Sequence, residues 1–297
     1  MQIPISFELE YRGRDADDQV IDFYDVSQAL LGFQRSLALT THLVLNREII
    51  TQAPALRGAR ILCSPPEDGS WKIKAMVVLT SAYALTTTPK DTMLGNVVLS
   101  VYDYVVSESL GVHVDYNKSI GQLYEENELK QSDLQKIEEH HVDSLIEKCS
   151  TAITEMHRPI SKNETAEVAQ IRSIVGGREM TVAVPLSIET YHYIHEAFEA
   201  DAPEVIEGRV SSYNSNTFKG RIFVFEEGRP VAFELSNACR TDSSVQLVVA
   251  SLSVNAVREY NNEWSTVYCK VIRVTTRSGH LKRYIILEIS HEPIPES

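Results

Sequence analysis

The sequence has few cysteines, and they do not form any pattern that marks a metal or redox site. The four of them, Cys63, Cys149, Cys239 and Cys269, are widely separated, and no two form a CxxC pair. This spacing argues against a zinc knuckle and against a dithiol redox motif. Isolated cysteines in a chain of this length are typical of reduced, buried side chains, so we expect a cytoplasmic protein.

The sequence also lacks the short motifs of the common enzyme classes. It contains no GxSxG, no P-loop, no GxGxxG and no kinase signature set. Gly176-Gly177 follows an expected helix and precedes an expected strand, whereas a phosphate-binding loop has the opposite order. We therefore predict no catalytic residues, no bound metal and no cofactor, and an enzyme is the less favoured class.

Long uninterrupted hydrophobic runs are missing as well. The two best candidates for a membrane span are residues 73–86, which are too few, and residues 93–112, which include Asp103 and Glu108. The first ten residues alternate between apolar and polar side chains, unlike a signal peptide. We expect no membrane association.

Positive charge is scarce relative to negative charge, and the imbalance lies in the first 204 residues. The formal net charge is −13, yet from residue 205 onward eleven Lys and Arg stand against ten Asp and Glu. All of the excess negative charge therefore lies in the first 204 residues. An acidic body repels phosphate backbones at long range, which disfavours nucleic-acid binding by the chain as a whole but not by its C-terminal third.

The composition is that of an ordinary globular protein, and the length suits two domains or one large domain with an appendage. The chain of 297 residues is 43% hydrophobic and 23% charged, which suits two folded domains with buried cores. The period of the apolar pattern changes after Asp201-Ala-Pro203. We predict one domain at residues 1–203 and a second at residues 204–297.

The first domain is organised around a long helix at residues 18–47. Its expected apolar face recurs at helical spacing, and Asp17 or Asp18 is expected to cap its start. That face comprises Val20, Phe23, Tyr24, Leu30, Leu31, Leu37 and Val44. A strand at residues 3–9 and a hairpin of strands 59–63 and 71–79 would form a small antiparallel sheet for this helix to cover.

The rest of the first domain is predicted to be largely helical. Residues 92–110 are apolar on most sides, which is typical of a core helix or of a helix at a subunit interface. Residues 121–167 are expected to be helical with an exposed acidic face, continuing as helix through 166–175. A short strand at 179–184 and a helix at 188–199 complete the domain.

The second domain is predicted to be a small β-barrel. Six strand candidates with a period of two occupy residues 205–213, 220–225, 230–235, 245–253, 266–275 and 282–290. Short strands at this spacing, joined by Gly and Asn turns, favour a barrel of SH3-like or OB-like size. The predicted fold class is therefore α+β.

A basic hairpin and several aromatic residues make this barrel a candidate binding site. Stacking aromatics beside a basic groove are what a single-strand-binding barrel needs. Alternatively, the aromatics are core residues and the charges keep a strand edge soluble. The predicted binding residues are Lys270, Arg273, Arg277, Lys282, Arg283, Tyr213 and Phe218.

One histidine-containing segment offers a possible metal site. If residues 188–199 form a helix, His192, His195 and Glu199 lie on neighbouring turns of one face. The motif is looser than HExxH, and Ile194 and Phe198 in the same segment need burial. A metal site here is the minority interpretation.

Three stretches of the first domain carry a resemblance to other proteins. QALLGFQRSL in the long helix, APALRGARIL after it and PPEDGSW in the turn resemble an uncharacterised bacterial and phage protein family. The resemblance covers most of the chain. It implies a helical N-terminal domain with a hairpin, followed by a small β-barrel around GRVSSYNSNTFKGRIFVFEEGRPVAFEL. It brings no known activity and no functional residue.

Three functional hypotheses follow from the sequence. The first is a non-enzymatic interaction protein that self-associates through residues 92–112 and binds a protein partner through its acidic face or barrel. A bacterial immunity or phage counter-defence setting would fit it. The second is a nucleic-acid or nucleotide binder that uses the barrel. The third is a metal-dependent hydrolase at the His192/His195 helix.

Overall fold

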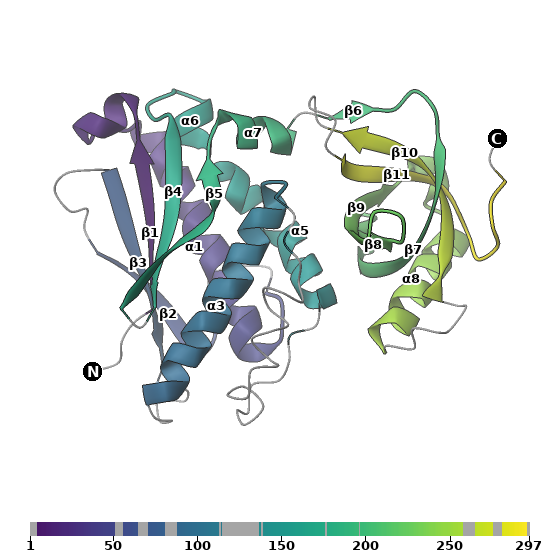
Figure 1. Cartoon of the computed structure of the whole chain (residues 1–297), viewed down its shortest axis with the longest axis horizontal. Coiled ribbons are helices and arrows are strands. Elements are labelled where there is room, and N and C mark those ends of the chain that lie inside the picture. The colour runs from purple at the N-terminus through teal and green to yellow at the C-terminus, as the bar shows by residue number, and fades with distance from the viewer. Residues whose placement is uncertain are drawn as a thin grey trace. The chain divides into compact units, whose positions relative to one another are not determined.

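The computed structural model divides the chain into two compact units, Met1–Ile194 and His195–Ser297 (Figure 1). We call them unit 1 and unit 2. The structure describes residues 5–50, 56–64, 71–80, 88–112, 114, 137, 139–175, 177–195, 197–257, 265–275 and 281–295, with side chains of 88–93 and 139–140 excepted. The fold is α+β, as predicted from the sequence.

Unit 1 is built on a five-stranded antiparallel sheet with the order β2-β3-β1-β4-β5. Its strands are β1 (Ile5–Arg12), β2 (Ala59–Ser64), β3 (Trp71–Leu79), β4 (Val168–Val175) and β5 (Arg178–Leu186). The predicted hairpin of β2 and β3 is confirmed. The predicted helix at 166–175 is wrong: alternate residues of β4 are buried, and Ile171 lies opposite Leu9 of β1.

The helices of unit 1 form a layer in which the two longest contact the sheet and the third longest packs against both of them (Figure 1). They are α1 (Phe23–Asn46), α3 (Thr88–Ser109), α5 (Glu139–Glu155), α6 (Arg158–Ser161) and α7 (Ile188–His195). Leu9 of β1, Leu37 of α1 and Val101 of α3 share one core. On the opposite face, Glu8 of β1 pairs with Lys74 of β3 at 3.5 Å. Of the acidic helix predicted at residues 121–167, residues 121–136 and 138 lie outside the described residues.

The long helix α1 begins later than predicted. Residues Arg14–Asp18 form a short 3-10 helix, and the N-cap of α1 is Asp22, whose carboxylate accepts a hydrogen bond from the Asp25 amide at 2.9 Å. The predicted apolar face is also wrong in its first half, because Phe23 and Leu31 are exposed. The side of α1 that packs on the core carries Ala29, Phe33 and Leu37 instead.

Helix α3 belongs to the core of unit 1. Val97, Val101 and Val105 are almost fully buried within the unit, so the core alternative considered from the sequence holds for α3. These valines are therefore covered by the unit's own sheet and helices. Within the described part of the chain, no helix combines the length and the apolar character needed to cross a membrane.

Unit 2 contains a closed five-stranded barrel. Its elements are β6 (Phe198–Glu199), β7 (Glu204–Asn214), β8 (Lys219–Val224), β9 (Arg229–Leu235), α8 (Asp242–Ala256), β10 (Val267–Thr275) and β11 (Leu281–Ser290). Strands β7, β8 and β9 form a meander, β11 joins β9 in parallel, and β10 closes the barrel between β11 and β7. This Greek-key order, with a helix between the third and fourth barrel strands, is OB-like rather than SH3-like.

The predicted strand at 245–253 is wrong, because these residues lie in α8. The hydroxyl of Thr241 caps the helix by accepting a hydrogen bond from the Ser244 amide at 3.2 Å. Ser251 then anchors α8 to the barrel, since its hydroxyl donates to the Ser265 carbonyl at 2.6 Å and accepts from the Val210 amide at 3.0 Å. A run rich in valine favours a strand locally, but this capping and docking make it a helix.

The cysteines are all reduced thiols in this structure, but not all of them are buried. Cys149, Cys239 and Cys269 are buried, whereas Cys63 near the end of edge strand β2 is exposed. The expectation that every cysteine is buried is therefore wrong for Cys63.

Candidate nucleic-acid interface

The outer surface of the barrel follows from the alternation of side chains along β8. Ile222 and Val224 are buried in the barrel core, so Lys219, Arg221 and Phe223 lie on the opposite, outer side. One short strand therefore places two cations and an aromatic ring on the outside of the barrel.

Neighbouring strands extend this surface. Arg221 lies opposite Ala232 of β9, and Ala232 in turn lies opposite Arg283 of β11. On the other side of β8, Phe223 lies opposite Arg209 of β7. We call the surface formed by Arg209, Lys219, Arg221, Phe223, Phe225 and Arg283 the barrel face.

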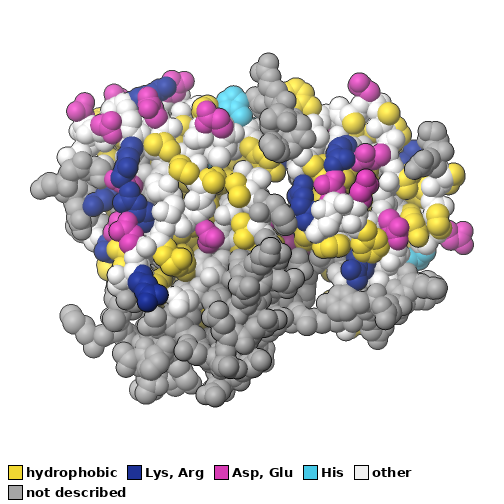
Figure 2. Space-filling model, viewed as in Figure 1, with side chains coloured by type: hydrophobic (Ala, Val, Ile, Leu, Met, Phe, Trp, Pro, Cys, Tyr) yellow, Lys and Arg dark blue, Asp and Glu magenta, His cyan; other side chains and the backbone are white. Residues whose placement is uncertain are grey.

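Arg209 sits against two phenylalanine rings at one side of the barrel face. Its guanidinium carbon lies 5.2 Å from the ring centre of Phe225 and 5.8 Å from that of Phe223, within cation–π range. The two rings are 6.2 Å apart, and Phe225 is 38% exposed. Figure 2 shows basic, acidic and hydrophobic side chains interspersed on the visible face of unit 2. This cluster combines a cation with an accessible ring.

Glu234 on β9 partly offsets the positive charge of the barrel face. Its two carboxylate oxygens lie 3.7 Å from Lys219 Nζ and 3.7 Å from an Arg283 guanidinium nitrogen. All three side chains are partly exposed, and such pairs are weak in water. Two cations therefore share one carboxylate, which leaves a local positive excess.

Arg221 is the most buried member of the barrel face. Only 8% of its surface is exposed, and its guanidinium donates a hydrogen bond to the Pro230 carbonyl at 3.1 Å. Its position is therefore fixed between β8 and β9. Arg221 therefore contributes positive electrostatic potential to the barrel face but offers little surface for direct contact with a ligand.

The structure separates the binding residues predicted from the sequence. Arg273 does not lie on the barrel face. It pairs with Glu227 and lies 3.6 Å from Glu204, and its guanidinium carbon is 5.9 Å from the Tyr284 ring centre. Burial is the main cause that raises the pKa of Tyr284, which keeps this phenol protonated. Arg273 thus joins β10 to the β8–β9 turn and to the start of β7.

The other predicted cations have different surroundings. Arg283 belongs to the barrel face. Lys270 and Lys282 are half-buried on β10 and β11, and Lys270 lies opposite Glu288 in the strand register. Arg277 lies outside the described residues.

The two predicted aromatic binding residues extend the core of the barrel. Tyr213 stacks on Phe233, with ring centres 6.3 Å apart and an angle of 8° between the planes, and burial raises the Tyr213 pKa. Phe218 packs against the same core, and the Arg240 guanidinium covers its ring at 4.9 Å. Neither ring stands as a free stacking platform.

Sequence reasoning missed Arg209, Lys219 and Arg221 as site residues. The alternation in KGRIFVF was a usable signal, since it places Lys219, Arg221, Phe223 and Phe225 on one side of a strand. The position of Arg209 depends on the register between β7 and β8, which no local pattern reveals.

The proposed metal-binding helix face is not present. Helix α7 ends at His195, and Glu199 lies in the short strand β6, which pairs with β10 of unit 2. His192 and Glu199 therefore do not share a helix. Across the residues described, no three His, Cys, Asp or Glu side chains gather as a metal site would require.

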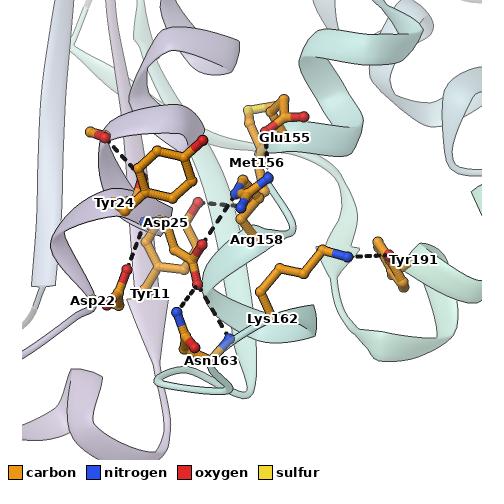
Figure 3. Close-up of polar contacts among 11 residues, drawn as sticks. Tyr11, Asp22, Tyr24, Asp25, Glu155, Met156, Arg158, Lys162, Asn163 and Tyr191 are labelled. Atoms are coloured by element: carbon orange, nitrogen blue, oxygen red, sulfur yellow. Dashed lines mark hydrogen bonds and ion pairs between the residues drawn. The ribbon is translucent and has the colours of Figure 1, made fainter.

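A buried carboxylate in unit 1 forms the centre of a second polar cluster (Figure 3). Asp25 of α1 is 1% exposed, and Arg158 Nε donates to its Oδ1 at 3.1 Å. The backbone and side-chain nitrogens of Asn163 donate to Oδ2 at 3.2 and 2.9 Å. These contacts join α1 to α6. Because both carboxylate oxygens of Asp25 already have hydrogen-bond donors, the carboxylate does not need a ligand as a partner.

Two family models match the chain. A domain of unknown function (DUF7946) matches residues 7–195, and a family of unknown function (DUF7947) matches residues 202–290. Comparisons with curated proteins and with solved structures gave no match. The chain belongs to the DUF7946 family, and its architecture is that of an uncharacterised two-domain family, as the sequence resemblance implied.

Proposed function

For this member of the DUF7946 family, we propose that unit 2 binds single-stranded nucleic acid on the barrel face. The observation that carries the proposal is the register that brings Arg209, Arg221 and Arg283 together on the outer side of four strands. In OB-like barrels the outer side of the second and third strands is a common site for oligonucleotides, although the fold alone does not establish that function.

The chemistry of the barrel face suits a flexible strand with unpaired bases. On this proposal Arg209, Lys219 and Arg283 contact phosphates, and a base stacks on the exposed ring of Phe225. Stacking of this kind requires a base free of its duplex partner. The proposal therefore specifies single strands without strong sequence preference, because every base has a π-face.

The acidic character of the rest of the chain bears on this proposal. With a net charge of −13, the chain repels a polyanion at long range, so binding depends on the local cations. Exposed charges act over roughly 8 Å at physiological ionic strength. The barrel face is thus expected to engage a short stretch of backbone.

The direct test is fluorescence anisotropy of the full chain with labelled oligo(dT) and oligo(rU) of about 12 nucleotides, and with a duplex of the same length. We expect the single strands to bind more tightly than the duplex. The double variant Arg209→Glu/Arg283→Glu should weaken single-strand binding by about tenfold or more, because each lost phosphate contact becomes repulsive.

Arg60→Glu is the matched control, because Arg60 is an exposed arginine on edge strand β2 of unit 1. It should leave binding unchanged. Thermal melting of each variant checks folding, and Arg209→Gln serves if the double reversal unfolds unit 2. Absence of binding at low salt, or equal loss in the Arg60 control, would contradict the proposal.

A further inference from the structure

The N-terminal part of α1 and the residue before it expose an unusual amount of apolar surface. Val20 is 59% exposed, Phe23 85%, Tyr24 61% and Leu31 60%. Phe23 and Leu31 are two turns apart on the helix, and Tyr24 lies beside Phe23. We call these four residues the α1 patch. Clustered exposed side chains of this kind mark an interaction site more often than scattered ones do.

The α1 patch is not the side of the helix that packs on the sheet. Ala29, Phe33 and Leu37 fill the core, and Gly32 brings α1 close to α5, since an added Cβ there would lie 2.3 Å from the Ala152 carbonyl oxygen. The helix is therefore apolar on two sides, of which unit 1 uses one. The other remains at the surface within the described part of the unit.

Hydrogen bonds and an ion pair at the first turn of α1 fix the position of the α1 patch. The Asp22 cap starts the helix, and the buried Asp25 ties the same turn to Arg158 and Asn163 (Figure 3). The Arg158 guanidinium also lies 5.0 Å from the Tyr24 ring centre. Rigid aromatic anchors lose little conformational entropy on binding, which is a property of interface hot spots.

Negative charge borders the α1 patch. Asp15, Asp17 and Asp18 are exposed in the short 3-10 helix just before it, and the Val20 amide donates to the Asp15 carbonyl at 3.0 Å, which folds this segment against the start of the patch. The cation of the same segment, Arg14, is already paired with Glu164 at 2.5 Å. A partner that covers the patch is therefore favoured if it carries positive charge around its apolar contacts.

We propose that the α1 patch is a docking surface for a basic segment of another protein, with apolar side chains of that segment covering Phe23, Tyr24 and Leu31. A second copy of the chain is the less suitable occupant. A two-fold interface places the same surface on both sides, so both copies would bring the same acidic residues to it. Charge complementarity thus distinguishes a cationic partner from self-association.

The proposal is tested by panning a displayed library of random peptides of about 15 residues against the immobilised full chain. A parallel panning uses the Phe23→Ser/Leu31→Ser variant. Peptides specific to the wild type should combine Lys or Arg with aromatic or aliphatic residues. Their synthetic versions should bind the double variant at least about tenfold more weakly.

Two further variants complete the test. Met180→Ser is the control, because Met180 is a 52% exposed apolar residue elsewhere on unit 1, and it should leave peptide affinity unchanged. Asp18→Lys should weaken the same peptides and reduce the salt dependence of binding, and it replaces the double variant if that one does not fold.

Three results would overturn the proposal. They are recovery of no wild-type-specific peptides, recovery of peptides without basic residues, and equal binding to wild type and variants. Light scattering that shows a wild-type dimer, lost in Phe23→Ser/Leu31→Ser, would assign the patch to a second copy instead.

Discussion

Phe225 carries the stacking part of the nucleic-acid proposal, because it is the exposed ring of the Arg209 cluster. Base–aromatic stacking is worth about 1–3 kcal/mol per base. Phe225→Ala should therefore weaken binding of labelled oligo(dT) by about tenfold, measured by anisotropy, while Phe225→Trp should retain it. Equal affinity for the Ala variant and the wild type would show that no base stacks on this ring.

His42 should make the stability of unit 1 depend on pH. Burial, together with the charge of Arg57, lowers its pKa below the usual 6.5, and Nδ1 accepts a hydrogen bond from the Arg57 amide at 3.2 Å. The unfolded chain therefore takes up a proton before the folded chain does. The stabilisation is complete above pH 6.5 and is lost as the pH falls through the lower pKa of the folded state.

The substitution His42→Asn removes this titration and keeps an acceptor near Nδ1. Urea unfolding of the wild type should show a falling free energy of unfolding between about pH 7.5 and 5.5, and the variant should show a smaller slope. Parallel slopes in the two proteins would mean that His42 titrates alike in the folded and unfolded states.

Cys63 should be the fast-reacting thiol among the four cysteines. Cys63 is exposed, whereas burial raises the pKa of Cys149 to about 12 and also raises the pKa values of Cys239 and Cys269. The thiolate is the reactive form. A thiol reagent should label one cysteine rapidly in the native protein and all four after denaturation, and Cys63→Ser should remove the rapid phase.

Gly32 controls the spacing of α1 and α5. An alanine gains about 1 kcal/mol of helix propensity, but its Cβ would lie 2.3 Å from the Ala152 carbonyl oxygen, a backbone atom with little freedom to move. Overpacking of this kind costs about 1–3 kcal/mol. Gly32→Ala should therefore lower the melting temperature, whereas Gln34→Ala on the same helix should not. A stabilised Gly32→Ala would show that the two helices separate easily.

Helices and strands whose apolar residues recur at a regular spacing could be predicted from the sequence. Those whose type depends on contacts with distant parts of the chain could not. The β2–β3 hairpin and strands β7, β8 and β9 follow from alternation and turn residues. β4 and α8 were assigned to the wrong class, because β4 is a strand through its pairing with β1 and α8 is a helix through its Thr241 cap and its docking at Ser251. Local propensity was overridden by tertiary structure in both.

The site was less predictable than the fold for a related reason. Charge and aromatic content located the barrel, but the predicted Arg273, Tyr213 and Phe218 have structural contacts. The barrel face instead depends on the register of four strands. For α1, the spacing of apolar residues identified the helix correctly. It did not reveal which of two apolar sides packs on the sheet.

The whole chain should show a modest salt dependence in nucleic-acid binding. Three cations that are exposed or partly exposed, Arg209, Lys219 and Arg283, imply a slope of about −2 in a plot of log affinity against log salt, at about −0.7 per phosphate contact for single strands. The acidic remainder of the chain should flatten this slope at low salt, because added salt also screens repulsion. A slope steeper than about −5 would indicate a larger contact surface than the barrel face.

The position of β1 in unit 1 has a consequence for how the sheet assembles. The β2–β3 and β4–β5 hairpins each form from neighbouring segments, but β1 lies between them, and Glu8 lies opposite both Lys74 and Arg172. Non-local pairings of this kind slow folding. Until β1 docks, both hairpins present an unpaired strand edge, which is the usual starting point for misassembly between chains. Pairing of β1 with β3 and β4 therefore removes two strand edges at once.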